Sequence, residues 1–342
     1  MGGCCSHQYE KGNLSIQRHA PEENPVLHGA DTIQYSHIQK ERKPQKHVNT
    51  MNTDESSVYD QNAPLISHAK PIDYIPNTNH NEQVQTVLQR IGEFVYHDNV
   101  SEDASLLNLG PHELENGVVY TGQWKKGYRH GRGKQIWADG SQYEGYWKED
   151  KANGKGRLIH VSGDHYDGDW LNGKAHGKGK YHHIEGVVYE GDWTDDKQHG
   201  HGIETWPDGS RYKGEFVKGM RHGKGKFFWA DGSHYEGEVT DGRIEGIGVY
   251  VWCDGRKYEG QWKNNKMEGK GVFTWTDGKR YEGEYLNDLK HGFGVFVWAN
   301  GNKYRGEWKA GKQHGRGFYS TKDHPEIEGE WKEGKIVQWL SH

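Results

Sequence analysis

Tyrosine recurs every 23 residues from position 120 to position 304 of this 342-residue chain, without one insertion. Glycine follows each of these tyrosines by two, eleven and thirteen residues. A fixed period of this length indicates an array of stacked supersecondary units. Each glycine costs up to about 1 kcal/mol in a helix interior, which excludes a helical repeat. The period therefore predicts a β-repeat array.

Side chains within each repeat alternate between two faces. In Tyr-x-Gly-x-Trp the tyrosine, glycine and tryptophan share one face of a strand, and the intervening polar residues share the other. A second strand repeats the pattern, as in Gly223, Gly225, Phe227 and Trp229. The chain is only 32% hydrophobic but has 14 Trp and 49 Gly. We therefore expect aromatic rings, lying over glycines, to replace aliphatic bulk as the core.

Turn residues separate the two strands. Lys126-Gly127 supplies positive-φ residues for a tight turn, and Asp139-Gly140 closes the next one, so each repeat reads as a hairpin. On the polar face, acids of the first strand are expected beside second-strand residues. The expected pairs are Asp169 with Lys178, and more weakly Glu190 with His201 and Glu284 with Phe293.

The motif Tyr166-Asp167-Gly168-Asp169-Trp170 with His176-Gly177-Lys178-Gly179 resembles the MORN repeat (membrane occupation and recognition nexus). Nine such units span 120–326, after a vestigial unit that ends at Asn116-Gly117 and before a terminal half-unit, 327–342. The resemblance implies an elongated, twisted, single-layer antiparallel sheet; nineteen strands would span about 90 Å. Units that depart from the motif are expected to pack less well. The departures are Val239 for the first aromatic, His160 and His183 for the second tryptophan, Asn153, Glu245 and Glu268 for the histidine, and Ile327 for the tyrosine.

Relatives of this kind serve as spacers and scaffolds, which implies a non-catalytic array that binds a protein, helical or cytoskeletal, in a concave aromatic groove. Terminal repeats of such arrays can also pair into homodimers. The residues predicted to line the groove are Tyr120, Trp124, Tyr143, Trp147, Tyr166, Trp170, Tyr189, Trp193, Tyr212, Trp229, Tyr258, Trp262, Tyr281, Tyr304 and Trp308.

The chain before the array divides into three parts. Residues 1–81 are polar and aperiodic, which predicts a disordered tail. Residues 82–97 place Val84, Val87, Leu88, Ile91 and Val95 at helical spacing behind the N-cap candidate Asn81, which predicts an amphipathic helix. That helix is either a lid on the first repeat or a switchable ligand for the repeat surface. Residues 98–116 are read as linker and vestigial repeat, and 117–342 as the MORN array.

The chain begins Met-Gly-Gly-Cys-Cys-Ser, which fits N-myristoylation of Gly2. One myristoyl chain binds membranes only marginally, so palmitoylation of Cys4 or Cys5 would supply the second anchor. The alternative is a disordered terminus that merely resembles the motif. Lys40, Arg42, Lys43 and Lys46 form a basic cluster read as a solvated charge run.

Charge and motifs narrow the function. Residues 1–116 hold 8 basic and 16 acidic residues, and 117–342 hold 36 and 33, which argues against nucleic acid as a partner. No run approaches 18 apolar residues, and no nucleotide-binding or nucleophile motif occurs, so we expect no enzyme, cofactor or metal site. Histidines such as His130 and His176 recur once per hairpin and are read as structural.

The sequence therefore predicts a membrane-anchored scaffold on the cytosolic face, at the plasma membrane or at a ciliary or cortical site. Two rival readings are a phosphoinositide-binding module and a regulatory subunit of a lipid kinase-like enzyme.

Overall fold

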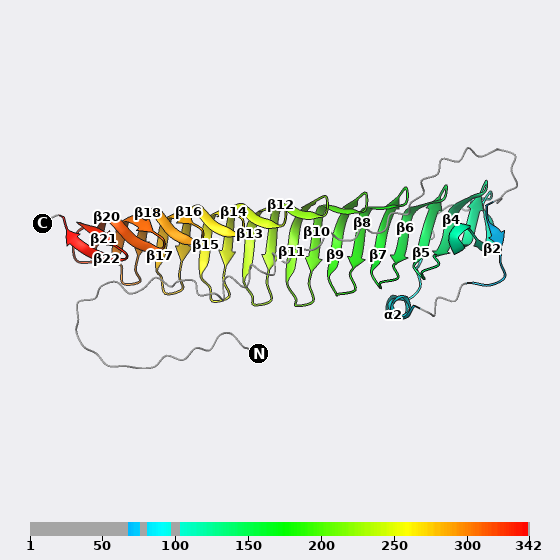
Figure 1. Ribbon diagram of the computed structural model, residues 1–342, viewed down its shortest axis with the longest axis horizontal. Helices are drawn as coiled ribbons and strands as arrows, with labels where there is room; N and C mark the ends of the chain where they lie inside the picture. The colour runs from blue at the N-terminus through cyan, green and yellow to red at the C-terminus, as the bar shows by residue number, and fades with distance from the viewer. Residues whose placement is uncertain (1–67, 76–80, 97–102, 341–342) are drawn as a thin grey trace.

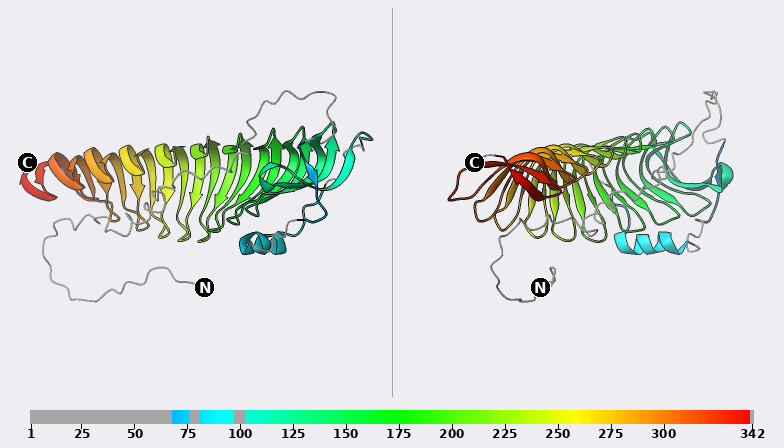
Figure 2. Two further views of the ribbon diagram at one scale, coloured as in Figure 1. Left: turned by 45° about the vertical axis from the view of Figure 1, so that its right-hand side comes forward. Right: turned by 60° about the vertical axis from the view of Figure 1, so that its left-hand side comes forward.

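The computed structural model describes residues 68–75, 81–96 and 103–340. They form one antiparallel sheet of 22 strands, drawn out into a long ribbon (Figure 1), together with one short α-helix. Each strand from β2 to β22 pairs with its sequence neighbours, and β1 pairs with β2. The twist accumulates along the whole ribbon (Figure 2). The predicted all-β repeat fold is confirmed, with 22 strands rather than nineteen.

The elements are β1 (Lys70–Pro71), α2 (Glu82–Ile91), β2 (Leu107–Glu113), the 3₁₀ turn η2 (Glu115–Gly117), β3 (Val119–Lys125), β4 (Tyr128–Ile136), β5 (Gln142–Lys148), β6 (Lys151–Ile159), β7 (His165–Leu171), β8 (Lys174–His182), β9 (Val188–Thr194), β10 (Lys197–Thr205), β11 (Arg211–Val217), β12 (Met220–Phe228), β13 (His234–Thr240), β14 (Arg243–Val251), β15 (Lys257–Lys263), β16 (Lys266–Thr274), β17 (Arg280–Leu286), β18 (Leu289–Val297), β19 (Lys303–Lys309), β20 (Lys312–Ser320), β21 (Ile327–Lys332) and β22 (Lys335–Trp339).

Both turns of each repeat have the predicted chemistry. In the hairpin turn after β3, Lys126 and Gly127 have φ of 50° and 82°, the left-handed pair of a type I′ turn. In the turn that follows β4, Trp137 N donates to Ser141 O and Gly140 has φ of 91°. Left-handed residues at both ends keep the connections short, so every strand returns beside its predecessor.

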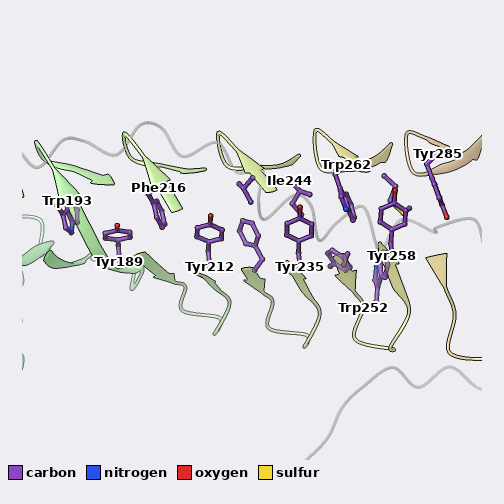
Figure 3. Packing of buried hydrophobic residues seen from close by; sticks show 14 of the residues in the cluster. Tyr189, Trp193, Tyr212, Phe216, Tyr235, Ile244, Trp252, Tyr258, Trp262 and Tyr285 are labelled. Atoms are coloured by element: carbon purple, nitrogen blue, oxygen red, sulfur yellow. The ribbon is translucent and has the colours of Figure 1, made fainter. Parts of the chain in front are cut away.

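Each first strand bends sharply at its central glycine. On a straight strand, residues four apart are separated by about 13 Å. The ring centroids of Tyr120 and Trp124 lie 5.1 Å apart, edge to face, and those of Tyr143 and Trp147 lie 5.0 Å apart. In Figure 3, Tyr189 and Tyr212 face Trp193 and Phe216 across the interior, from opposite ends of the bent strands. The sheet therefore curls around its own aromatic rings.

Glycine permits this packing because the tyrosine ring lies on bare backbone. Gly122 and Gly133 are in register, and a Cβ on Gly133 would overlap the Tyr120 ring. The Tyr120 hydroxyl donates to Gln123 O (2.9 Å), and Trp147 Nε1 of the next repeat donates to Gly133 O (3.0 Å). Tyrosine, glycine and the next tryptophan thus form one interlocked unit that recurs along the array.

A bulge in each second strand uses the polar residue beside the tryptophan. Gly177 has φ of 66°, and the adjacent Lys178 backbone N–H donates to the Asp169 carboxylate (3.0 Å). The Asp169 carboxylate pairs with Lys155 Nζ (2.7 Å), while Glu190 pairs with Lys180 (3.1 Å). Asp169 therefore lies beside Lys178 as expected, and Glu284 beside Phe293, but through the backbone N–H of the second residue and not its side chain. The expected pair of Glu190 with His201 is wrong, because Glu190 lies opposite Ile203.

Successive hairpins are also joined at their turns. Asp196 Oδ1 accepts from Ala175 N (2.8 Å), and Asp196 N donates to Ala175 O (3.0 Å). At the histidine position, Glu245 Oε1 and Glu268 Oε2 each accept from the next turn's backbone N–H at 2.9 Å. Glutamate at this position therefore still connects neighbouring hairpins.

The unit containing Val239 packs fully, against expectation. Val239 lies opposite Ile244 in the ladder, and their exposed fractions are 1% and 0%. The branched side chain of Ile244 occupies space that an aromatic ring fills in other units. Loss of one ring is therefore compensated across the strand pair.

Two boundaries differ from those predicted. The helix ends at Ile91, not at residue 97, because Gly92 (φ 71°) caps it, and Val95 lies outside it, 71% exposed. The N-cap prediction is confirmed, since the Asn81 side chain accepts from Val84 N. Residues 68–75, predicted as part of the disordered tail, include β1. The rest of that tail, residues 1–67 and 76–80, lies outside the described residues.

Candidate functional site

The rings predicted to line a partner groove form the core instead. Fourteen of the fifteen have exposed fractions between 0% and 5%, and Trp229 is half-buried. The curl of the sheet brings the tyrosine and tryptophan rings into contact with each other, which buries them. The prediction of an open aromatic groove is therefore corrected.

The buried tyrosine hydroxyls have structural roles. Tyr212 donates to Glu215 O (3.2 Å), and Tyr258 donates to Gln261 O (2.9 Å). Burial raises the pKa of both hydroxyls above the ordinary value. They stay protonated and act as donors, not as bases.

The opposite, polar face of the sheet carries the helix. Val84 and Val87 of α2 pack against Ile159 of β6, whose side chain is 1% exposed. Asn81 Nδ2 donates to Val161 O (3.3 Å), next to the start of the helix. In Figure 1, α2 lies beside the ends of β5 to β7. The amphipathic helix therefore docks on the outward face through the buried side chain of Ile159.

The segment that follows the helix stays on this face. Gly92 O accepts from Arg157 Nη1 (2.9 Å), and the Arg157 guanidinium lies over the Phe94 ring at 5.9 Å. The Tyr96 ring meets Tyr146 edge to face at 5.5 Å and lies under Arg132 at 5.6 Å. The outward face thus holds an extended, aromatic-bearing segment through cationic side chains.

An open groove of about 1600 Å³ continues along the same face, from Lys155 of β6 to Val249 of β14. The glycine pairs form its floor, and outward side chains form its walls. Its lining includes seven lysine or arginine residues, four carboxylates and His201, so the lining is net positive. Between the helix and β8 lies a smaller pocket of about 520 Å³, which His182 and His183 help to line.

Two histidines of this face, His165 and His182, pack against each other. His165 and His182 stack at 4.4 Å between ring centroids with an interplanar angle of 4°. Burial, and secondarily the neighbouring His182, lowers the pKa of His165 to about 4. Both rings are therefore neutral at pH 7 and can stack without repulsion.

Comparison with known proteins identifies the repeat. The MORN repeat model matches nine consecutive segments, 120–142, 143–165, 166–186, 189–211, 212–234, 235–255, 258–280, 281–303 and 304–324, which together exceed half of the chain. The chain belongs to the MORN repeat family. The nine units predicted from the sequence are confirmed.

No curated protein matches the chain. Among solved structures, the TCP10 domain of Danio rerio CPAP in complex with a STIL peptide is similar at 11% identity and a TM-score of 0.35, over 70% of this chain and 100% of that one. The SAS-4 (dCPAP) TCP domain of Drosophila melanogaster, in complex with a proline-rich motif of Ana2, is similar at 10% identity and a TM-score of 0.29, over 55% and 95% of the two chains. At these values neither similarity carries an argument.

The once-per-repeat histidines of the MORN units contact the next turn. His130 Nδ1 accepts from Glu149 N (3.4 Å), and His199 Nδ1 accepts from Lys218 N (3.5 Å). Within 68–75, 81–96 and 103–340, no three histidine, cysteine or acidic side chains are placed to hold a metal ion. In the same ranges, no helix has the length and apolar character needed to span a bilayer.

The predicted acylation sites of this MORN protein, Gly2, Cys4 and Cys5, lie outside the described residues, as does the basic cluster 40–46. The groove on the polar face was not predicted, because only the aromatic face was considered as a protein-binding surface. The signal in the sequence was Ile203, an apolar residue at a position where the three preceding units carry lysine or arginine.

Proposed function

We propose that this MORN protein is a non-catalytic scaffold held at the cytosolic face of a membrane, and that its outward sheet face binds a protein partner. Acyl groups on Gly2 and on Cys4 or Cys5 are the anchor. The observation that carries the binding role is the docking of α2 and residues 92–96 on that face, which shows how it holds a polypeptide segment. The open groove beyond them leaves room for a second segment.

A single myristoyl chain gives weak membrane binding, and each additional buried methylene adds about 0.8 kcal/mol. Gly2→Ala should therefore move most of the protein from the membrane to the soluble fraction. Cys4→Ser with Cys5→Ser should leave a weak, easily washed association. Fractionation of cells expressing each variant tests the anchor; a Gly2→Ala protein retained as firmly as wild type would refute it. Imaging of the intact protein then distinguishes plasma-membrane, ciliary and cortical sites.

A phosphoinositide-binding array is the second candidate, favoured by the basic residues that line the groove. Four carboxylates stand among them, however, and would repel a highly charged headgroup. Flotation of the Gly2→Ala, Cys4→Ser, Cys5→Ser chain with phosphoinositide vesicles separates the two candidates. Salt-sensitive flotation would favour lipid recognition, and its absence would favour a protein partner. A regulatory subunit would instead co-purify with a catalytic chain.

A further inference from the structure

One residue breaks the charge pattern of the outward face inside the groove. At the position directly after the repeated tyrosine, the units from 143 to 281 carry Glu or Asp, except for one lysine. That lysine is Lys213 of β11, which is exposed and lies opposite Lys226 of β12. Like charges directly opposite on neighbouring strands are destabilising. The chain therefore keeps an unfavourable pair at the middle of the groove.

Its neighbours leave the positive charge unbalanced. On the other side of Lys213 the register partner is Ile203, where the preceding unit places Lys180 beside Glu190. In the described residues, ion pairs within 4.0 Å include Lys226 with Glu236 (2.7 Å) but none for Lys213, whereas the nearby Lys224 lies opposite Glu238 of β13. Lys213 therefore lies exposed on β11 with a lysine and an isoleucine, and no acid, as its register partners.

Apolar surface flanks these cations on both sides. Ile203 of β10 is 41% exposed and Ile247 of β14 is 62% exposed. Arg211 lies over the outward Phe228 ring at 4.5 Å, as Arg157 does over Phe94. A ligand that fits must offer carboxylates to Lys213 and Lys226 and apolar or aromatic side chains to the two isoleucines.

The groove dimensions suit an extended segment. It crosses nine strands, from β6 to β14. Eight strand spacings span about 38 Å, the length of about 12 extended residues. The groove also continues the track of residues 92–96, since Asp167 lines it and pairs with Arg157 (2.6 Å), which binds Gly92 O.

We propose that the groove centred on Lys213, opposite Lys226, binds an extended acidic segment with aromatic or apolar side chains, supplied by a protein partner. This deepens the proposed scaffold function and rests on it. The four groove carboxylates disfavour a continuous polyanion such as nucleic acid, and an extended segment uses the exposed isoleucines as well as the cations. Electrostatic complementarity of this kind sets the choice of partner.

The test uses the full chain and a fluorescein-labelled peptide of about 12 residues in which Glu alternates with Phe. Fluorescence anisotropy measures its binding. Two control peptides replace every Glu by Lys or every Phe by Ser. Wild type should bind the Glu/Phe peptide and should bind both controls at least about tenfold more weakly. Equal binding of all three peptides, or no binding of the Glu/Phe peptide, would overturn the proposal.

The decisive variant is Lys213→Glu, which installs the acid that most other units carry. It pairs a carboxylate with Lys226 opposite, so the fold should not be weakened, yet peptide affinity should fall about tenfold or more. Arg305→Glu is the matched control: it makes the same charge change at the same repeat position, outside the groove. It should leave affinity within about twofold. Unchanged affinity in Lys213→Glu would refute the site.

A final arm separates alternative sources of negative charge. Inositol hexakisphosphate should compete only weakly with the peptide; strong competition that Lys213→Glu abolishes would make the groove an anion site and overturn the peptide assignment. The binding is measured in solution and does not depend on acylation. Failure of the Gly2→Ala fractionation test would therefore leave this result standing, and failure here would leave the anchor standing.

Discussion

The tyrosine and the glycines of each repeat depend on each other, because the tyrosine ring fills the space that a side chain at the glycine position would occupy. Gly225 has an ordinary negative φ, so alanine there meets no backbone strain, only the Tyr212 ring. Overpacking of this kind forces side chains out of their rotamers or shifts backbone. Glycine is therefore required at position 225 because a side chain there would overlap the Tyr212 ring, whereas glycine in the turns is required for its positive φ.

We therefore expect Gly225→Ala to lower the free energy of unfolding by about 2 kcal/mol. Gly110→Ala is the control, because a Cβ there meets nothing within 4 Å. Chemical denaturation followed by tryptophan fluorescence measures both. Equal stability of the two variants would show that the Tyr212 ring can move aside.

Lys290 is a charged residue inside the aromatic core. Its Nζ lies 4.7 Å from the Phe296 ring centroid and 4.8 Å from that of Trp308, with Trp275 and Tyr281 also around it. The ring faces favour the charged form, whereas burial disfavours it and lowers the pKa of Lys290 to about 7 from 10.5. The preceding unit has Met267 at this position.

The pH dependence follows from that pKa. Between pH 7 and 10.5 the unfolded chain binds a proton at Lys290 that the folded chain has lost, so stability rises with pH across this window. Lys290→Met should raise the melting temperature at pH 7, and the gain should shrink toward pH 10. Thermal denaturation across this range measures the effect, with the exposed Lys263→Met as control. A gain that is constant with pH would argue against the depressed pKa.

At the scale of elements, α2 is held to the array by a few apolar contacts. Val84 and Val87 are the helix residues buried against Ile159, and the helix is only 10 residues long. A helix of this length is not stable alone in water. Docking and helix formation should therefore be coupled.

Val84→Asp places a carboxylate in this contact and should release and unfold α2, with loss of amide protection across 82–96 and little change in the array. Gln89→Asp adds the same charge at an exposed helix position and should preserve protection. Hydrogen exchange with mass spectrometry measures both. Full protection in Val84→Asp would mean that the polar contacts of Asn81 and Arg157 hold the segment without the apolar ones.

The period, the hairpin turns and the choice of buried face could all be predicted from the sequence, since each depends on local chemistry such as Lys126-Gly127 or the alternation around Tyr166. The bend of each first strand could not be predicted, because the alternation of side chains indicates which face a ring occupies but not how strongly the strand curves. Hence the prediction that the rings form the core is confirmed, whereas the prediction that the same rings also line an open groove is wrong. The docking position of α2 also depends on a distant residue, Ile159, that no helical pattern reveals.

At the scale of the whole molecule, contacts are made between neighbouring hairpins, so stability is a sum of unit and interface contributions. Every unit from Tyr120 onward has the same length, and the interlocking bonds, such as Trp262 Nε1 to Gly248 O (3.1 Å), always reach one hairpin back. Removing one whole period joins equivalent positions, so that each remaining hairpin meets a neighbour with the same strand order and direction. Removing half a period does not, because the next strand would then run in the wrong direction.

Deletion of 258–280, one matched unit, should therefore give a folded array shorter by two strand spacings, about 10 Å. Deletion of 258–269 alone should disrupt the array from β14 onward, since Tyr-x-Gly strands would face positions meant for their partners. Small-angle scattering gives the length, and hydrogen exchange locates any unfolding. Collapse of the whole-unit deletion, or a folded half-unit deletion, would show that contacts beyond nearest neighbours determine the fold.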